Sequence, residues 1–205
     1  MGRPVPLGMR KIGVGLLGCG EVGSGVYSLL ARKGGRLSGV SGARFQLVGV
    51  AVRHPGRRRK VRVARRLLTA RAEALVRDPR VDVVVELIGG VARAKSLVLS
   101  ALRHGKHVVT ANKALLAECG SELFAAAKKA RREILFEASV GGGIPIIKAL
   151  REGLAANQVR SIHAIINGTT NYILTQMAKQ NLDFNEALRE AQARGYAEAN
   201  PRFDI

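Results

Sequence analysis

Three glycines with the spacing G-x-G-x-x-G, Gly18, Gly20 and Gly23, lie between an apolar run at 12–17 and a helix-like stretch at 22–30. In that order, the first glycine permits a tight turn and the second lets the main chain approach a pyrophosphate. The third lets the helix pack closely on the strand, so that the positive end of its dipole faces the phosphates. The pattern therefore predicts a dinucleotide site, and a turn without special function is the alternative. The expected pyrophosphate-binding residues are Gly18, Cys19, Gly20, Glu21, Val22 and Gly23.

A second chemical feature is the basic sequence that follows the apolar run at 45–52. Arg53 comes directly after this run, residues 57–60 are all arginine or lysine, and no carboxylate lies there. NAD sites usually have an acidic residue at the end of the second strand, where it accepts hydrogen bonds from the ribose hydroxyls. An arginine in that place can instead pair with the 2′-phosphate of NADP. The sequence thus favours NADP over NAD, with Arg53 as the ligand, and solvated loop arginines are the alternative.

The elements that must position these residues alternate between apolar runs and helical patterns. This alternation predicts an α/β fold, a Rossmann-type doubly wound parallel sheet, whose ligands lie beyond the carboxyl ends of the strands. The turns after Leu17, Val52, Ile88 and Thr110 should therefore meet at one edge of the sheet, which adds Gly89 to the expected cofactor contacts. The expected strands are 12–17, 45–52, 81–88, 107–110 and 133–138, and the expected helices are 22–30, 61–76, 92–104 and 114–132.

The pattern changes after Ala138, where a glycine-rich segment at 139–145 resembles a hinge. Beyond it we expect a strand at 161–166 and helices at 169–179 and 184–194. The expected organisation is a flexible leader at 1–10, a dinucleotide-binding domain at 11–140, and the beginning of an incomplete α+β substrate domain at 141–205.

Composition limits the class of protein. The 47% hydrophobic content of the 205 residues excludes wholesale disorder, and no apolar run reaches the roughly 18 residues that a membrane span needs. Cys19 and Cys119 lie far apart, which favours a reduced, cytoplasmic protein. The net charge is +19, and the basic residues concentrate between Arg53 and Arg80, where eleven of them face only Glu73 and Asp78. Because no aromatic residue is interleaved there for base stacking, we expect a solvated basic helix and no specific nucleic-acid partner.

Four further motifs carry a family resemblance. They are T-A-N-K at 110–113, E-A-S-V-G-G-G-I-P at 137–145, I-N-G-T-T-N-Y-I-L at 166–174 and G-Y-A-E-A-N-P at 195–201. Together with the glycine turn, the chain resembles the homoserine dehydrogenase family from about residue 11 to 205. The resemblance implies reduction of L-aspartate 4-semialdehyde to L-homoserine with NADP, or with NAD, on the route to threonine and methionine.

The resemblance also implies residue roles. Hydride transfer to an aldehyde builds negative charge on the carbonyl oxygen, which a nearby cation stabilises, and the family's matching lysine, here Lys113, lies by the nicotinamide and substrate. Glu198 matches the residue that anchors the substrate's α-ammonium, and Gly195 would let main chain approach cofactor and substrate. In the turn before the helix at 169–179, Thr169 or Thr170 could cap that helix.

A monovalent cation, sodium or potassium, is a further implied ligand. The family's site resembles Glu137 and the glycines after it, with carbonyl oxygens of Val140, Gly142 and Ile144 as hard ligands. A flexible glycine loop is the alternative. The resemblance further implies a homodimer, at least for full-length members.

The chain departs from the family near its end. Asn200 stands where an aspartate is usual, and the family's next aspartate and its proton-donating lysine would fall beyond Ile205. We therefore expect cofactor binding with little or no turnover. A non-catalytic nucleotide- or polyanion-binding fragment is one alternative. A related semialdehyde or dihydrodipicolinate-type reductase is another, although the N-G-T-T-N and G-Y-A-E strings argue against it.

Overall fold

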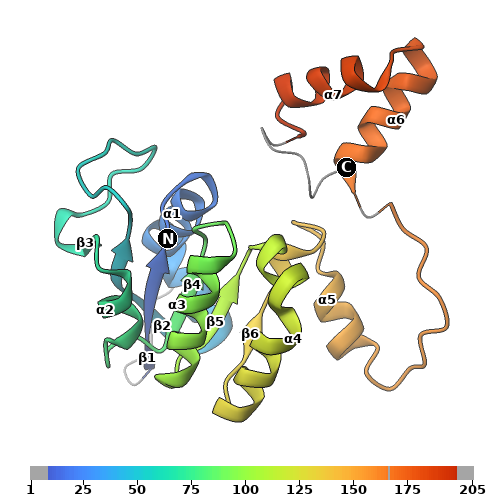
Figure 1. Cartoon of the computed structure of the whole chain (residues 1–205). Coiled ribbons are helices and arrows are strands. Elements are labelled where there is room, and N and C mark those ends of the chain that lie inside the picture. Colours follow the sequence, from blue (N-terminus) through green and yellow to red (C-terminus); the bar gives the residue numbers. More distant parts are fainter. Residues whose placement is uncertain (1–8, 166, 198–205) are drawn as a thin grey trace. The chain divides into compact units, whose positions relative to one another are not determined.

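The computed structural model describes residues 9–165 and 167–197, in two compact units that divide between Gly142 and Gly143. The first unit contains a six-stranded parallel sheet with the order β3-β2-β1-β4-β5-β6 (Figure 1). The strand order reverses between β1 and β4, which is where doubly wound sheets bind their ligands. The strands are β1 (Arg10–Leu17), β2 (Ala43–Ala51), β3 (Leu68–Thr69), β4 (Val83–Glu86), β5 (His107–Thr110) and β6 (Ile134–Leu135). The predicted fold class is confirmed.

Helices cover both faces of this sheet. One apolar cluster joins α2, α3 and α4 to the sheet, and a second joins α1 to the opposite face; α3 and α4 lie in front of the sheet in Figure 1. The neighbours Val84 and Val85 are both buried and belong to different clusters, which explains why the strand reads as a continuous apolar run. The helices are α1 (Glu21–Ser41), α2 (Ala72–Arg77), α3 (Ala92–Arg103) and α4 (Lys113–Ala130).

The predicted basic helix at 61–76 is wrong. A 3-10 turn, η1 (Arg65–Leu67), and the edge strand β3 occupy its middle, and α2 begins only at Ala72. The apolar residues that suggested one helix face, Val63, Leu67 and Leu68, pack instead against the α1 side of the sheet. Their burial is satisfied by an irregular segment at the sheet edge, so no helix is needed.

Helix α1 is longer than predicted. It continues through Gly34, Gly35 and Gly39 to Ser41, and Gly42 ends it in the left-handed conformation with its N–H bonded to the Ser38 carbonyl. The Ser38 hydroxyl donates to the Gly34 carbonyl at 2.8 Å, one turn earlier. The glycines therefore weaken the sequence signal without ending the helix.

In the described residues of the second unit, all of the regular secondary structure is helical, and residues 154–165 are irregular. A short α5 (Ile146–Lys148) runs into a π-helical turn, η3 (Ala149–Gly153), and α6 (Gly168–Gln180) packs on α7 (Phe184–Ala193) through a small apolar cluster. The predicted strand at 161–166 is wrong for residues 161–165, which pair with no strand; Ile166 lies outside the described residues. The apolar alternation there is not matched by a neighbouring strand, and a strand needs one to form its ladder.

The predicted threonine cap of α6 is also wrong. Asn167 is the N-cap, and its Oδ1 accepts from the Thr170 main-chain N–H at 3.1 Å. The Thr169 hydroxyl donates to the Tyr196 carbonyl at 2.5 Å, which ties the start of α6 to the segment after α7. None of the helices in the described part of the chain is long and apolar enough to cross a membrane.

Candidate functional site

The three glycines of the first turn have different surroundings. Gly18 has a φ of +99°, and a Cβ added there would lie 2.6 Å from the Leu87 carbonyl oxygen. A Cβ at Gly23 would lie 2.5 Å from the Gly18 oxygen, whereas a Cβ at Gly20 would meet no atom within 4 Å. Gly18 and Gly23 therefore permit close packing of β1, α1 and the turn after β4. Gly20 leaves its main chain open on the side where a pyrophosphate is expected.

The N-terminus of α1 carries no side-chain cap. Gly20 is its N-cap residue, so the first N–H groups of the helix, which lack intrahelical acceptors, are available for an anion. Ser24 is buried, and its hydroxyl lies 3.8 Å from the Cys19 sulfur. Cys19 also packs against the apolar cluster on the α1 side.

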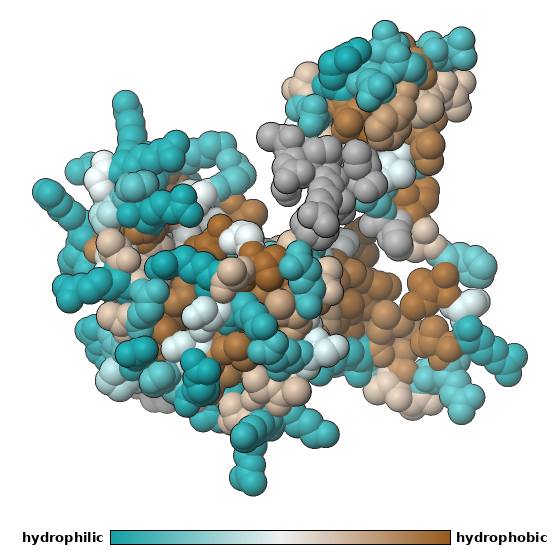
Figure 2. All heavy atoms as spheres, in the orientation of Figure 1, coloured by the Kyte–Doolittle hydropathy of each residue, from teal (hydrophilic) through white to brown (hydrophobic). Residues whose placement is uncertain are grey.

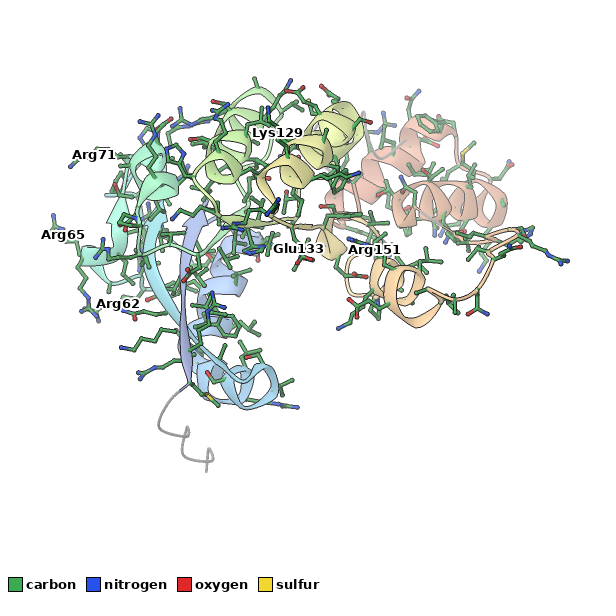
Figure 3. The ribbon with its side chains drawn as sticks, turned by 90° about the horizontal axis from the view of Figure 1, so that it is seen from below. Arg62, Arg65, Arg71, Lys129, Glu133 and Arg151 are labelled. Atoms are coloured by element: carbon green, nitrogen blue, oxygen red, sulfur yellow. The ribbon has the colours of Figure 1, made fainter. Side chains whose placement is uncertain are left out.

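A basic loop at 52–64 joins the end of β2 to η1. Its hydrophilic side chains project at the left in Figure 2, and in Figure 3 Arg62, Arg65 and Arg71 point outward. Arg53 is exposed and directly follows Val52, whose N–H donates to the Thr69 carbonyl at 2.8 Å. This bond fixes the start of the loop beside β3.

Two side-chain contacts shape the basic loop. The Arg59 guanidinium donates to the carbonyls of His54, Pro55 and Arg57, at 2.5, 2.9 and 2.6 Å. The Lys60 ammonium pairs with the carboxylate of Glu21 in the first turn of α1. Arg59 is thereby committed to the loop itself, and Lys60 ties the loop to the helix N-terminus. Since both partners of the Glu21–Lys60 pair are exposed, the pair adds little stability.

The carboxyl ends of β4 and β5 are joined by a buried carboxylate. Glu86 is 0% exposed, its Oε1 accepts from the Ile88 N–H at 2.9 Å, and its Oε2 accepts from the Thr110 hydroxyl at 2.7 Å. Glu86 and Thr110 are register partners in the parallel pair. Burial of a carboxylate is unfavourable without such donors, so these two bonds hold the strand ends together.

Asn112 extends this network to the start of α4. Its N–H donates to the Thr110 hydroxyl at 3.0 Å, and its amide nitrogen donates to the Gly90 carbonyl at 2.7 Å. Its Oδ1 accepts from the Leu115 N–H at 3.1 Å, which caps α4. The network of Glu86, Thr110 and Asn112 therefore links the turn at Gly89 and Gly90 to the helix that begins with Lys113.

Glu86, Thr110 and Asn112 were not among the site residues predicted from the sequence. A glutamate inside a β-branched run was one available signal, because an acidic residue in a fully buried strand needs a partner. A threonine and an asparagine just before a helix were another, since both residue types favour caps. The strand pairing that joins the two signals was not visible in the sequence.

The predicted residues of the first unit gather at one edge of the sheet. The glycine turn follows β1, Arg53 follows β2, Gly89 follows β4, and the exposed Lys113 follows β5. Gly89 has a φ of +70°, as glycine readily permits. This arrangement is the one expected for a dinucleotide site, and the individual ligand contacts stay predictions.

The remaining predicted residues lie near or beyond the division between the units. Glu137 begins the 3-10 turn η2 (Glu137–Ser139), and Val140 follows it with its N–H 3.4 Å from the Glu137 carbonyl. Gly142 ends the first unit and Ile144 belongs to the second, so a cation held by these residues stays a prediction. Gly195 follows α7 with a φ of +76°, and Glu198 lies outside the described residues. In residues 9–165 and 167–197, no three histidine, cysteine or acidic side chains gather as a metal site.

A cavity of about 730 Å³ lies elsewhere in the first unit. Lys11, Tyr27, Phe45 and Asp82 are among its lining residues, and the glycine turn is not. Asp82, one of its polar side chains, accepts from the Gly13 N–H at 2.7 Å. The strand order and the open glycine turn indicate a ligand site at the carboxyl edge of the sheet, away from this cavity.

Comparison with known proteins identifies relatives over nearly the whole chain. Residues 18–137 match the homoserine dehydrogenase NAD-binding domain, and residues 145–205 match the homoserine dehydrogenase domain. Homoserine dehydrogenases of Synechocystis sp. and Bacillus subtilis are 47% and 46% identical over 94% and 96% of this chain, which spans 44% and 46% of their lengths. The chain thus spans less than half of these relatives.

Solved structures give a consistent result. A homoserine dehydrogenase from Thiobacillus denitrificans superposes with a TM-score of 0.85 at 47% identity, over 97% of this chain and 46% of that one. A hyperthermophilic archaeal homoserine dehydrogenase in complex with NADPH gives a TM-score of 0.75 at 25% identity, over 95% of this chain and 65% of that one.

Proposed function

The chain belongs to the homoserine dehydrogenase family, and on that premise we propose that it takes part in the NADPH-dependent reduction of L-aspartate 4-semialdehyde to L-homoserine. The observation that best supports this proposal is the open glycine turn, which lies where the strand order of the sheet reverses. Lys113 follows the end of β5 on the same edge of the sheet. The first unit would hold the dinucleotide, and a homodimer is part of the same proposal.

The residues present fit a dinucleotide. Gly20 leaves open the space that a Cβ would fill, and the uncapped N-terminus of α1 offers N–H groups to the pyrophosphate. When bound, the nicotinamide supplies the hydride that the aldehyde carbon accepts. The ammonium of Lys113 would stabilise the negative charge that develops on the aldehyde oxygen. Glu198, by resemblance, would hold the substrate's α-ammonium.

A preference for NADP rests on the basic loop. Arg53 is exposed at the end of β2, where an acidic residue would otherwise accept from the ribose hydroxyls. Arg59 is engaged with loop carbonyls, so Arg53 is the better candidate for the 2′-phosphate. The NADPH bound to the archaeal relative supports the proposal.

The test is a fluorescence titration of the folded chain with NADPH and with NADH, in the presence and absence of L-homoserine. We expect NADPH to bind more tightly than NADH, and homoserine to tighten the binding of NADPH further.

Arg53→Ala should weaken NADPH binding about tenfold or more, the scale of a lost charge-assisted bond, and should leave NADH binding unchanged. Arg44→Ala is the matched control, because Arg44 is an exposed arginine at the amino end of the same strand. A folded chain that binds neither cofactor contradicts the proposal, and equal NADH and NADPH affinities contradict the NADP preference.

Polyanion binding is a second candidate, favoured by the exposed arginines of the basic loop. Such binding should weaken steeply with salt and should not distinguish NADPH from other polyphosphates. Repeating the NADPH titration with tripolyphosphate as competitor, in low and high salt, separates this candidate from a specific cofactor site.

A further inference from the structure

Glu86 is a buried acidic group that the proposed chemistry does not use. Its side chain is 0% exposed, and its two recorded donors, the Ile88 N–H and the Thr110 hydroxyl, are both neutral. A carboxylate that ends a buried strand costs desolvation energy that an apolar residue would not. Its two bonds reach the turn after β4 and the last residue of β5.

The same network reaches the start of α4. The Thr110 hydroxyl, which donates to Glu86, accepts from the Asn112 N–H, and the Asn112 side chain bonds both the Gly90 carbonyl and the Leu115 N–H. Lys113 is the first residue of α4 and lies between Asn112 and Leu115, which this cap joins. The position of Lys113 relative to the Gly89–Gly90 turn therefore depends on a continuous set of side-chain bonds.

A second bond restrains the end of β5 from the other side. The Ser139 hydroxyl donates to the Thr110 carbonyl at 2.9 Å. Thr110 thus has its hydroxyl committed to the network and its carbonyl committed to the segment after β6. Groups held on several sides keep their positions more closely than groups held by one bond.

We propose that Glu86 is a positioning residue, which acts through Thr110 and Asn112 to hold Lys113 and the Gly89–Gly90 turn in a fixed relation at the cofactor site. The inference rests on the proposed function, because it assumes a dinucleotide at this edge. Glu86 does not contact the ligand. It sets the geometry of two segments that do.

The experiment uses the full chain with Thr110→Val and Glu86→Gln. Thr110→Val removes the hydroxyl that donates to Glu86 and accepts from Asn112. Glu86→Gln keeps the shape of the side chain but replaces one accepting oxygen by an amide nitrogen, so either the Ile88 N–H or the Thr110 hydroxyl loses its acceptor. Each variant is measured for NADPH affinity, for thermal unfolding and for the labelling of Lys113 by an amine-directed reagent, quantified by peptide mass spectrometry with and without NADPH.

We expect both variants to bind NADPH about tenfold more weakly, since small displacements of positioned groups have large effects on a site. We also expect NADPH to lose much of its protection of Lys113 against labelling. Thr110→Ser keeps the hydroxyl and should restore both properties. Thr69→Val is the matched control, because Thr69 also ends a strand and its hydroxyl accepts from the Arg71 N–H at 3.0 Å, away from the network; it should leave both properties unchanged.

The outcomes separate the two hypotheses. If the folded wild-type chain binds no NADPH, the proposed function fails and the inference fails with it. If the wild type binds NADPH and the folded variants bind equally well with the same protection of Lys113, the network is only structural and the inference is wrong. If Thr110→Val does not fold, Glu86→Gln and Thr110→Ser decide in the same way.

Discussion

The two edges of the sheet use polar side chains differently. At the carboxyl edge, the network of Glu86, Thr110 and Asn112 is buried and built from hydrogen bonds to neutral groups, and Gly20 beside it leaves main chain open. At the amino edge, charged side chains close the turns. Asp82 accepts from the Gly13 N–H, and the nearly buried Lys106 donates to the Asp78 carbonyl at 2.9 Å.

The difference lies in which main-chain groups remain available. The amino edge pairs its main chain with side chains: Arg132 donates to the Gly105 carbonyl at 2.5 Å, and Asp78 accepts from the Arg80 N–H at 2.9 Å. The N-cap of α1 at the carboxyl edge makes no such side-chain bond. Side chains therefore close turns at both edges, and the carboxyl edge also has the uncapped N-terminus of α1, which suits it to a ligand.

The largest expected effect is that of Gly18→Ala. The left-handed φ alone costs on the order of 1–3 kcal/mol, and the added Cβ would lie 2.6 Å from the Leu87 carbonyl oxygen, a main-chain atom that cannot rotate away. We expect a lower unfolding temperature and no detectable NADPH binding, measured by thermal unfolding and fluorescence titration.

Two further glycines sharpen this prediction. Gly20→Ala should leave stability nearly unchanged but weaken NADPH binding, because its Cβ meets no protein atom and would fill the open side of the turn. Gly25→Ala, inside α1 and equally uncrowded, should raise stability by about 0.5–1 kcal/mol and leave binding unchanged. If Gly20→Ala binds NADPH as the wild type does, the pyrophosphate does not lie at this turn.

An intermediate effect is expected at the opposite edge, for Lys106→Met. The substitution keeps most of the stem but removes the charged donor to the Asp78 carbonyl, which keeps only the Val81 N–H at 3.0 Å, in a place where Lys106 is 7% exposed. We expect a loss of about 1–3 kcal/mol in the free energy of unfolding, measured by urea denaturation, with unchanged NADPH affinity. Lys129→Met, on the exposed side of α4, is the control and should change neither. A weaker NADPH affinity in Lys106→Met would show that the edges are coupled.

The sequence predicted those parts of the molecule that depend on local pattern. The strands at β1, β2, β4, β5 and β6 and the glycine turn were recognisable, because runs buried on both faces and a G-x-G-x-x-G turn have local signatures. The apolar spacing at 61–76 was misleading, since Val63 and Leu67 find burial at a sheet edge without forming a helix. Periodicity cannot distinguish these two ways of burying the same side chains.

The buried network shows a different limit. Glu86 and Thr110 are 24 residues apart and meet only because β4 and β5 are adjacent and in register. The residues that flank Glu86 or Thr110 in the sequence do not predict that the two side chains are in contact. The strand predicted at 161–166 is absent at 161–165 for a related reason, because an alternating pattern forms a strand only where a partner strand is present.

The smallest effect concerns the charge of Asp78 at the amino edge. The hydrogen bond from the Arg80 side chain lowers the pKa of the Asp78 carboxyl below its usual value, against a smaller opposing effect of burial. A lowered pKa in the folded state means that the stabilisation is fully present above the pKa of the unfolded state. It is lost as the pH falls through the pKa of the folded state.

Asp78→Asn keeps an oxygen that can accept from the Arg80 N–H but removes the charge. Its destabilisation, measured by urea denaturation, should therefore be small at pH 7, smaller than that of Lys106→Met, and should decrease as the pH falls through the lowered folded-state pKa. A destabilisation that stays constant over this range would mean that the charge contributes nothing and that the amino edge is held by hydrogen-bond geometry alone.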